Sequence, residues 1–266
     1  MIKRQKRVFI ILTTICAALL GGCSMGETKI EYERLVKALD EGDMATVMSA
    51  SDDGYAYVEE RVIESERGKK EGGEYGRTLY QNTNGVYNIN ERVLYGYSNQ
   101  EIVNKAADGK ESNKGKEDIY STKIIYEDNL IRSDKGELNL SPIRLNLDIF
   151  SGLEDLKPKN DKVKYNEPNR IGYTLSETEF NNILNDNLKL TYDKFDSASI
   201  TVGFNKSKDT DDKEMLIEEI NIVVWLEKGK EDTGKSTHLL EINWSFPESS
   251  NKNINMKEKY LEIANN

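Results

Sequence analysis

The stretch MLIEEINIVVWLEKGKEDTGKSTHLLEINWSF, residues 215–246, decides the fold class. Apolar residues alternate with mostly polar ones in two runs of this stretch, and a third alternating run precedes it at residues 200–204. Strict alternation places the apolar side chains of a strand on one face. The three runs are separated by polar loops at 205–213 and 227–235, so they predict a three-stranded antiparallel meander with one apolar face.

Shorter runs extend the strand pattern toward the N-terminus, at 55–63, 78–81, 86–89, 93–97, 119–126 and 129–134. Asn84-Gly85 lies between two of these runs and is typical of a two-residue hairpin turn, so we expect a hairpin there. Residues 98–118 are mostly polar, and this composition predicts a mobile loop or a short frayed helix. An inter-domain linker is the alternative for that segment.

Helical signals come before and between the predicted strands. Apolar residues of segment 32–39 recur at intervals of three and four, which predicts an amphipathic helix. Asp43 is a suitable N-cap for a second, short helix. Ser141-Pro142, a capping residue followed by proline at the first helical position, predicts the start of a third helix.

A fourth helix has the best-specified start in the chain. Ser176 and Glu179 have the spacing of a capping box, in which each side chain bonds the backbone N–H of the other residue. Leu175 and Phe180 occupy the positions of a hydrophobic staple. The apolar stripe of this helix is the nearest apolar surface in the sequence that could cover the meander.

The order of these elements is helices, strands, two embedded helices and a final group of strands. A strand–helix alternation of the kind that builds a parallel sheet is absent from the pattern. The sequence therefore predicts an α+β fold, in which helices pack on the apolar face of a strongly curved, half-barrel-like antiparallel sheet.

Residues 1–23 have the organisation of a bacterial lipoprotein signal. A basic segment at residues 3–7 precedes an apolar run at residues 8–20, which is too short to span a bilayer as a helix. Leu20-Gly21-Gly22-Cys23 then matches a lipobox, which consists of an aliphatic residue, two small residues and a cysteine. The alternatives are a plain cleaved signal and an uncleaved membrane anchor.

The lipobox predicts cleavage between Gly22 and Cys23 and a diacylglycerol thioether on the Cys23 sulfur. Two acyl chains hold a protein stably at a membrane, whereas one chain binds only marginally. We therefore expect a signal peptide at 1–22, a lipidated tether at 23–29 and a single extracytoplasmic domain at 30–266. The expected location is the outer face of the cell membrane.

The charge of the chain limits its partners. The sequence has 37 Lys and Arg against 47 Asp and Glu, and loss of residues 1–22 removes four positive charges and no negative charge, which leaves a net charge of −14. Nucleic acids require a basic face, and anionic lipid headgroups attract basic segments. We therefore expect no nucleic-acid partner, and membrane contact through the lipid on Cys23 alone.

Cysteine usage limits the chemistry of the mature chain. Cys16 leaves with the signal and Cys23 carries the lipid, so no cysteine remains for a disulfide, a thiolate nucleophile or a metal site. Stability must then come from a hydrophobic core, which roughly 240 residues can supply. The scarcity of cysteine and the Lys-, Glu-, Asn- and Ile-rich composition favour a Gram-positive source.

Few residues offer catalytic or metal chemistry. His238 is the only histidine, and it is in phase with Leu240 and Ile242, which favours a place at the rim of a core face over a catalytic role. The acidic run at 209–212 does not fit a calcium loop, because Glu214 stands where the loop needs glycine. Phosphate-loop, dinucleotide and hydrolase motifs are absent from the sequence. We expect no catalytic residue, no cofactor and no metal.

Two resemblances extend this interpretation. The segment YERLVKALDEGD, residues 32–43, resembles the start of uncharacterised Gram-positive lipoproteins of the DUF3952 kind, which implies no known activity. The order of the N-terminal helix, the Pro142 helix and the Ser176 helix before a final meander resembles, in topology alone, half-barrel lipoproteins of the LolA/LppX type. That second resemblance implies a bent sheet that is lidded by helices and holds lipid.

We expect the meander and the Ser176 helix to enclose an apolar cleft. Its predicted lining residues are Phe180, Ile183, Leu184, Ile222, Leu240, Ile242 and Trp244. The protein would then be a non-enzymatic binding module for a lipid, another apolar ligand or a protein partner. The alternative is a cell-surface structural or protein-interaction lipoprotein with a filled core and no small-molecule site.

Overall fold

The computed structural model describes residues 32–48, 54–70, 73–105, 111–127, 130–133, 150–159, 169–206, 215–229, 234–247 and 257–263. The predicted signal peptide at 1–22, Cys23 and the predicted tether lie outside these residues. So do the predicted helix start at Ser141-Pro142 and the acidic run at 209–212.

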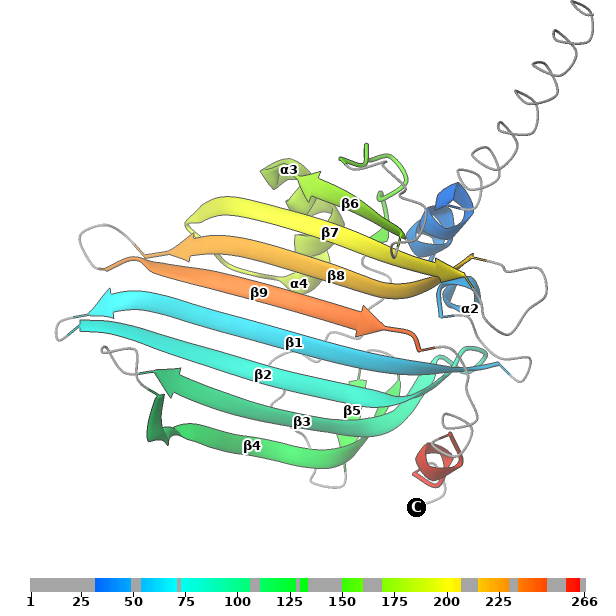
Figure 1. Ribbon diagram of the computed structural model, residues 1–266, viewed down its shortest axis with the longest axis horizontal. Coiled ribbons are helices and arrows are strands. Elements are labelled where there is room, and N and C mark those ends of the chain that lie inside the picture. Colours follow the sequence, from blue (N-terminus) through cyan, green and yellow to red (C-terminus); the bar gives the residue numbers. More distant parts are fainter. Residues whose placement is uncertain are drawn as a thin grey trace, which may run out of the picture.

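Within the described residues, nine strands form one antiparallel sheet (Figure 1). The strands are β1 (Tyr55–Lys70), β2 (Gly73–Asn88), β3 (Val93–Lys105), β4 (Glu111–Glu127), β5 (Leu130–Ser133), β6 (Asn169–Leu175), β7 (Lys194–Lys206), β8 (Met215–Lys228) and β9 (Ser236–Ser245). Their order across the sheet is β5-β4-β3-β2-β1-β9-β8-β7-β6. The predicted α+β class with a curved antiparallel sheet is confirmed, and the predicted meander is β7–β9.

The first and last strands in the chain order, β1 and β9, lie side by side in the middle of the sheet (Figure 1). β1 pairs with β9 from Glu59 opposite Ser245 to Gly68 opposite Ser236. This pairing joins two meanders, β1–β5 and β6–β9, in which every strand otherwise pairs with its neighbours in the chain. Each face of the sheet therefore continues from one meander into the other.

The prediction of a hairpin turn at Asn84-Gly85 is wrong. Both residues lie inside β2, paired with β1 and β3, and Gly85 lacks the positive φ that a tight hairpin turn needs. The chain turns at residues 89–92 instead. There the side-chain oxygen of Asn88 accepts a hydrogen bond from the backbone N–H of Asn90 at 3.0 Å, which stabilises the turn.

The prediction of a mobile loop or frayed helix at residues 98–118 is also wrong. β3 continues to Lys105 and β4 begins at Glu111, so most of this segment is strand. β3 has a paired strand on each side, and its backbone N–H and C=O groups are satisfied whatever its side chains are. Side-chain polarity alone therefore gave the wrong structure.

The predicted N-terminal helix spans residues 32–41. Its buried stripe is the predicted one, Tyr32, Leu35, Val36 and Leu39. The carboxylate of Asp40 accepts hydrogen bonds from the backbone N–H of Gly152, at 3.1 Å, and of Glu154, at 2.7 Å. This carboxylate ties the end of the helix to a turn that lies far away in the sequence.

Two helix starts match their predictions. α2 (Met44–Val47) begins after Asp43, whose side chain accepts a hydrogen bond from Thr46 N. α3 (Glu177–Glu179) continues into the π-helix η2 (Phe180–Asn185) and α4 (Asp186–Leu188). The capping box is present, because Glu179 N donates to Ser176 Oγ and Ser176 N donates to the Glu179 carboxylate.

The sheet has two faces, which differ in what covers them. We use the term core face for the side to which Val58, Glu60 and Val62 of β1 point, and outer face for the opposite side. The helix at 32–41, α2 and the α3–α4 run share one hydrophobic cluster with the core face. On the outer face, the C-terminal segment 257–263 forms a separate, smaller cluster with Val86.

Candidate binding site

The seven residues predicted to line an apolar cleft lie in one hydrophobic cluster. They come from η2, β8 and β9 and are all buried: Phe180, Ile183, Leu184, Ile222, Leu240, Ile242 and Trp244. Phe180 stacks on Phe195 of β7 with ring centroids 5.3 Å apart, and Trp244 meets Phe150 edge-on at 5.9 Å. The structure thus brings the Ser176 helix and the meander together. The cleft itself stays a prediction.

One row of core-face residues shows where the chemical character of the sheet changes. The strand register aligns Ile220, Trp244, Glu60, Thr83 and Ser98 on β8, β9, β1, β2 and β3 in turn. The side chains in this row are apolar as far as β9 and polar from β1 onward. In this row the change falls where the two meanders meet, whereas Val58 and Val62, on the same face of β1, belong to the apolar cluster.

We use the term polar band for seven polar side chains on the core face of β1–β4. They are Glu60, Gln81, Thr83, Ser98, Gln100, Tyr120 and Thr122, and all are buried. Glu60 is 2% exposed and Gln81 is 1% exposed. Polar groups lose water when they are buried, and the loss is unfavourable unless each finds a hydrogen-bond partner. The hydrogen-bond partners of these seven side chains therefore decide how unfavourable their burial is.

Hydrogen bonds link the band across three strands. The hydroxyls of Thr83 and Ser98 lie 3.0 Å apart, and Ser98 Oγ lies 3.2 Å from the Tyr120 hydroxyl. Gln81 Oε1 accepts from Gln100 Nε2 at 3.0 Å and from the Tyr120 hydroxyl at 3.3 Å. Gln81 Nε2 is buried with no hydrogen-bond partner in the described part of the chain.

Glu60 connects the polar band to the apolar half of the core face. Its Oε1 accepts a hydrogen bond from Trp244 Nε1 at 3.1 Å, across the β1–β9 pair. Burial raises the pKa of Tyr120, a hydrogen bond with Ser98 lowers it, and the charge of Glu60 adds to the rise. The Tyr120 hydroxyl therefore keeps its proton at neutral pH and remains a donor.

Sequence reasoning missed the polar band, although a signal was present. Gln81 and Thr83 are two residues apart, as are Ser98 and Gln100, so each pair points to one face of its strand. The pattern did not indicate that this face is buried, because polar alternation usually marks the solvent side of a sheet.

His238 lies on the core face near the start of β9, opposite Leu226 of β8. Ser236 Oγ is 3.1 Å from His238 Nε2, and Glu66 Oε1 is 3.7 Å from the same nitrogen. A Ser–His–acid relay places the serine and the acid on opposite ring nitrogens, so this geometry differs from a hydrolase triad. Burial lowers the pKa of His238, and the charge of Lys228 lowers it further.

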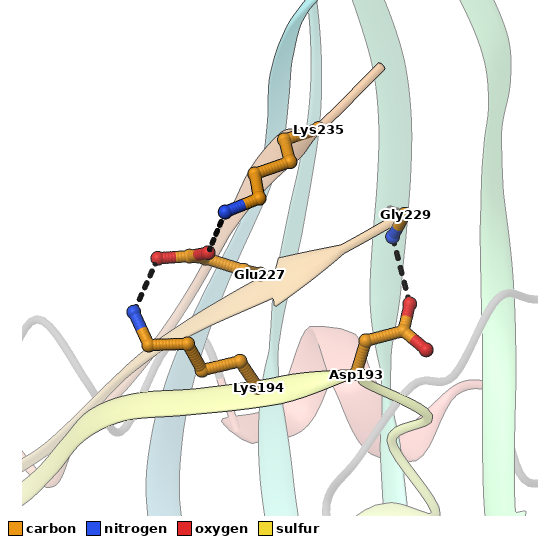
Figure 2. A network of polar contacts seen from close by, with 5 residues as sticks. All are labelled: Asp193, Lys194, Glu227, Gly229 and Lys235. Carbon is orange, nitrogen blue, oxygen red and sulfur yellow. Dashed lines mark hydrogen bonds and ion pairs between the residues drawn. The ribbon is translucent and has the colours of Figure 1, made fainter. Parts of the chain in front are cut away.

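The same end of the sheet carries an exposed polar network (Figure 2). Glu227 lies between Lys194 and Lys235, with N–O distances of 2.6 and 3.7 Å, and the hydrogen bond from Lys194 lowers the pKa of Glu227. Asp193 accepts a hydrogen bond from the backbone N–H of Gly229 at 2.7 Å. Exposed ion pairs contribute little stability. We interpret this network as a set of contacts that holds the ends of β7, β8 and β9 together.

The residues that the structure describes include no group of three or more His, Cys, Asp or Glu side chains that could hold a metal ion. They also include no helix with the length and apolar character needed to cross a membrane.

Comparison with known proteins gives a match for part of the chain. No curated protein matches the sequence. A solved structure, the crystal structure of a DUF1329 family protein from Desulfovibrio piger ATCC 29098 at 1.75 Å resolution, is 9% identical, with 80% of this chain and 89% of that chain covered and a TM-score of 0.19. A family model described as a domain of unknown function, DUF3952, matches residues 18–119. Over those residues, the chain is similar to the DUF3952 family, as its sequence predicted.

Proposed function

We propose that the protein is a lipid-anchored extracytoplasmic binding module, which holds a lipid or another amphiphile and catalyses no reaction. The observation that carries the proposal is the junction on the core face between the apolar strands β6–β9 and the polar band. A ligand with an apolar tail and a polar head needs both kinds of contact side by side.

The anchoring half of the proposal is supported by the lipobox that ends at Cys23. The mature chain carries a net charge of −14, so attraction to anionic headgroups does not hold it at a membrane. A diacylglyceryl cysteine supplies two acyl chains, which are sufficient for stable attachment. The sheet would then stand on the outer face of the cell membrane, within reach of membrane lipids.

Replacement of Cys23 by alanine is expected to abolish lipid labelling and to release or mis-process the protein, because no other thiol follows the signal. Radiolabelled palmitate and membrane fractionation measure the two effects. Cys16→Ala is the matched control, since Cys16 lies in the apolar run of the signal and its loss should leave labelling intact. Membrane retention of the Cys23→Ala protein with unchanged labelling would rule out lipobox anchoring.

The binding half is supported by the cost of burying polar groups. A core that only holds a fold together is as stable, or more stable, with apolar side chains of similar volume. Here seven polar side chains are buried on one face, and the amide nitrogen of Gln81 has no hydrogen-bond partner among the described residues. A partner supplied by a ligand would account for both features.

A structural or protein-interaction lipoprotein without a small-molecule site is the second candidate. The complete burial of Phe180, Ile222 and Trp244 favours it, because a solid core needs no ligand. The two candidates differ in whether the purified chain carries an amphiphile. Mass spectrometry of co-purifying lipids therefore tests the proposal, and about one bound molecule per chain is expected.

A further inference from the structure

We propose that the C-terminal segment 257–263 is a releasable strap, and that the surface beneath it docks a short helix of a partner protein. The helix that fits this surface presents a lysine, a tyrosine and an aliphatic residue at intervals of three residues. The strap, red in Figure 1, lies on the outer face of the sheet. The docking surface is therefore separate from the core face, on which the amphiphile is proposed to bind.

The surface under the strap consists mainly of aromatic side chains. We use the term tyrosine patch for the outer-face residues of β1–β4 that pack around the strap: Tyr55, Tyr57, Val86, Tyr95, Tyr97 and Ile125. The four tyrosines stay only partly buried although the strap covers them. Tyrosine combines a large apolar ring with a hydroxyl that tolerates water, so such a surface can be covered or exposed. Aromatic residues of this kind are enriched at protein interfaces.

Few buried side chains hold the strap in place. Tyr260 is 2% exposed and Ile263 is 7% exposed, and both belong to a small cluster that is separate from the main hydrophobic cluster. The Tyr260 ring contacts the rings of Tyr57 and Tyr97, with centroids 6.1 and 5.7 Å away. A helix this short is not stable alone in water, and segments with few buried contacts open before the rest of a protein unfolds. The strap can therefore leave the patch while the sheet stays folded.

Lys257 makes a second specific contact with the patch. Its Nζ lies 4.3 Å from the centroid of the Tyr55 ring, within the range of a cation–π interaction. Asn88 Nδ2 donates to the Tyr55 hydroxyl at 3.3 Å and to the Glu91 carboxylate at 2.9 Å. An aromatic ring and a negative charge thus lie side by side under the lysine, and both attract a cation.

The charges around the patch are unevenly distributed. Burial raises the pKa of Tyr95, and the nearby charge of Glu91 is the next largest cause of the rise. Glu127 is also near, but it pairs with Arg132 at 3.4 Å, and Lys123 of β4 borders the patch on the same side. The Glu91 side of the patch is therefore the side that suits a cation.

The strap shows the spacing that the patch recognises. Lys257, Tyr260 and Ile263 are three residues apart, and residues at this interval lie on one face of a helix. The backbone N–H of Ile263 donates to the Tyr260 carbonyl at 3.0 Å, so the helical turn continues to Ile263. Glu258 and Glu262 are exposed on the strap. The lysine, the tyrosine and the isoleucine thus form the face that a partner helix has to reproduce.

The strap competes with such a partner for the patch. A helix of another protein with the same three side chains makes the same contacts, so both cannot be bound at once. Residues 246–256 join the strap to the end of β9, and this covalent link keeps the strap at a high effective concentration. A partner must therefore bind more tightly than the strap, or be abundant, to open the surface.

The test uses residues 23–266 with Cys23→Ser and a fluorescein-labelled peptide that has the sequence of residues 255–266. Tyr260→Ala in the protein removes the side chain that seats the strap, so this variant should bind the peptide with a Kd on the order of 100 µM. The chain that keeps Tyr260 should bind at least about tenfold more weakly, because its own strap occupies the patch. Fluorescence anisotropy measures both affinities.

Two peptide variants test the recognition pattern. Lys257→Glu in the peptide reverses the charge that meets Tyr55 and Glu91, and it should weaken binding to the Tyr260→Ala protein about tenfold. Glu258→Gln in the peptide is the matched control, because Glu258 is exposed on the strap. It should change the affinity by less than about twofold.

Two protein variants test whether the peptide binds at the patch. Added to Tyr260→Ala, Tyr57→Ala removes a ring that contacts Tyr260 in the strap and should weaken peptide binding at least about tenfold. Tyr80→Ala is the matched control, since Tyr80 is partly buried on the same face but lies outside the patch. It should leave the affinity unchanged.

Each contrary outcome overturns a stated part of the proposal. Equal binding by the chains with and without Tyr260 shows that the strap is no cover, and the absence of binding to Tyr260→Ala shows that the patch is no docking surface. Unchanged binding of the Lys257→Glu peptide overturns the predicted partner chemistry. A dimer in sedimentation that Tyr260→Ala abolishes makes the occupant the strap of a second copy. A cooperative thermal transition checks folding, and Ile263→Ser is the second release variant if Tyr260→Ala does not fold.

Discussion

Replacement of Trp244 by alanine is expected to lower the free energy of unfolding by about 3–5 kcal/mol, as large-to-small changes in a packed core do. Trp244 is 0% exposed and belongs to the main hydrophobic cluster, with Phe150 against its ring. The substitution also removes the donor that bonds Glu60. It therefore leaves a cavity and a buried carboxyl group that has lost one partner. Chemical denaturation followed by circular dichroism measures the change.

Trp244→Phe separates these two losses. Phenylalanine keeps most of the ring and its contact with Phe150 but cannot donate to Glu60, so we expect a smaller loss of about 1–3 kcal/mol. If Trp244 lined an open cleft, less packing would be lost in the alanine variant. A loss below about 1 kcal/mol for Trp244→Ala would show that this part of the core face is not solid.

Gly96→Ala is expected to destabilise the protein by about 3 kcal/mol, the upper end of the usual cost of overpacking. Gly96 of β3 lies directly opposite Gly85 of β2, and both are buried. A Cβ atom on Gly96 would overlap the backbone oxygen of Asn84 and lie 3.1 Å from the Gly85 Cα. Backbone atoms in a paired strand cannot move aside, so β2 and β3 would have to separate locally. Thermal unfolding measures the loss.

Gly172→Ala is the matched control, because Gly172 also lies in a strand but an added Cβ would meet no atom within 4 Å. Its effect on the free energy of unfolding should stay within about 0.5 kcal/mol, or be slightly stabilising. Equal stability of the Gly96 and Gly172 variants would contradict the close approach of β2 and β3.

The parts of the fold that depend on local chemistry could be predicted from the sequence. Alternation at Ile220, Ile222 and Val224 defined the meander, because a strand with one buried face leaves that period in its residues. The capping box of Ser176 and Glu179 marked the start of a helix, since both partners of the motif are close in sequence.

The parts that depend on distant strands could not be predicted. β1 and β9 pair although most of the chain lies between them, and no local pattern encodes that neighbour. Asn84-Gly85 has the residues of a tight turn, but pairing with β1 on one side and β3 on the other keeps it extended. Residues 98–118 have the polar composition of a loop, yet hydrogen bonds to the adjoining strands satisfy most of their backbone N–H and C=O groups. In each case tertiary pairing overrides local preference.

The candidate site also contains residues that could be predicted from the sequence and residues that could not. The apolar residues Ile222, Ile242 and Trp244 could be found from the sequence, because apolar periodicity and burial go together. The polar band could not, because Gln81 and Thr83 have the polar alternation of solvent-facing residues and only the assembled sheet shows that they are buried. A buried polar side chain is more informative about a site than a buried apolar one, because polar side chains are mostly exposed in proteins.

Mass spectrometry of lipids bound to the purified chain is the most direct test of the proposed binding function. The form to use is residues 23–266 with Cys23→Ser, purified without detergent from cells that synthesise acylglycerols and phospholipids. We expect about one amphiphile per chain, bound in the intact protein and recovered by extraction. A chain that folds cooperatively, carries no amphiphile and takes up none from mixed lipid vesicles would contradict the binding function and leave a structural lipoprotein as the better description.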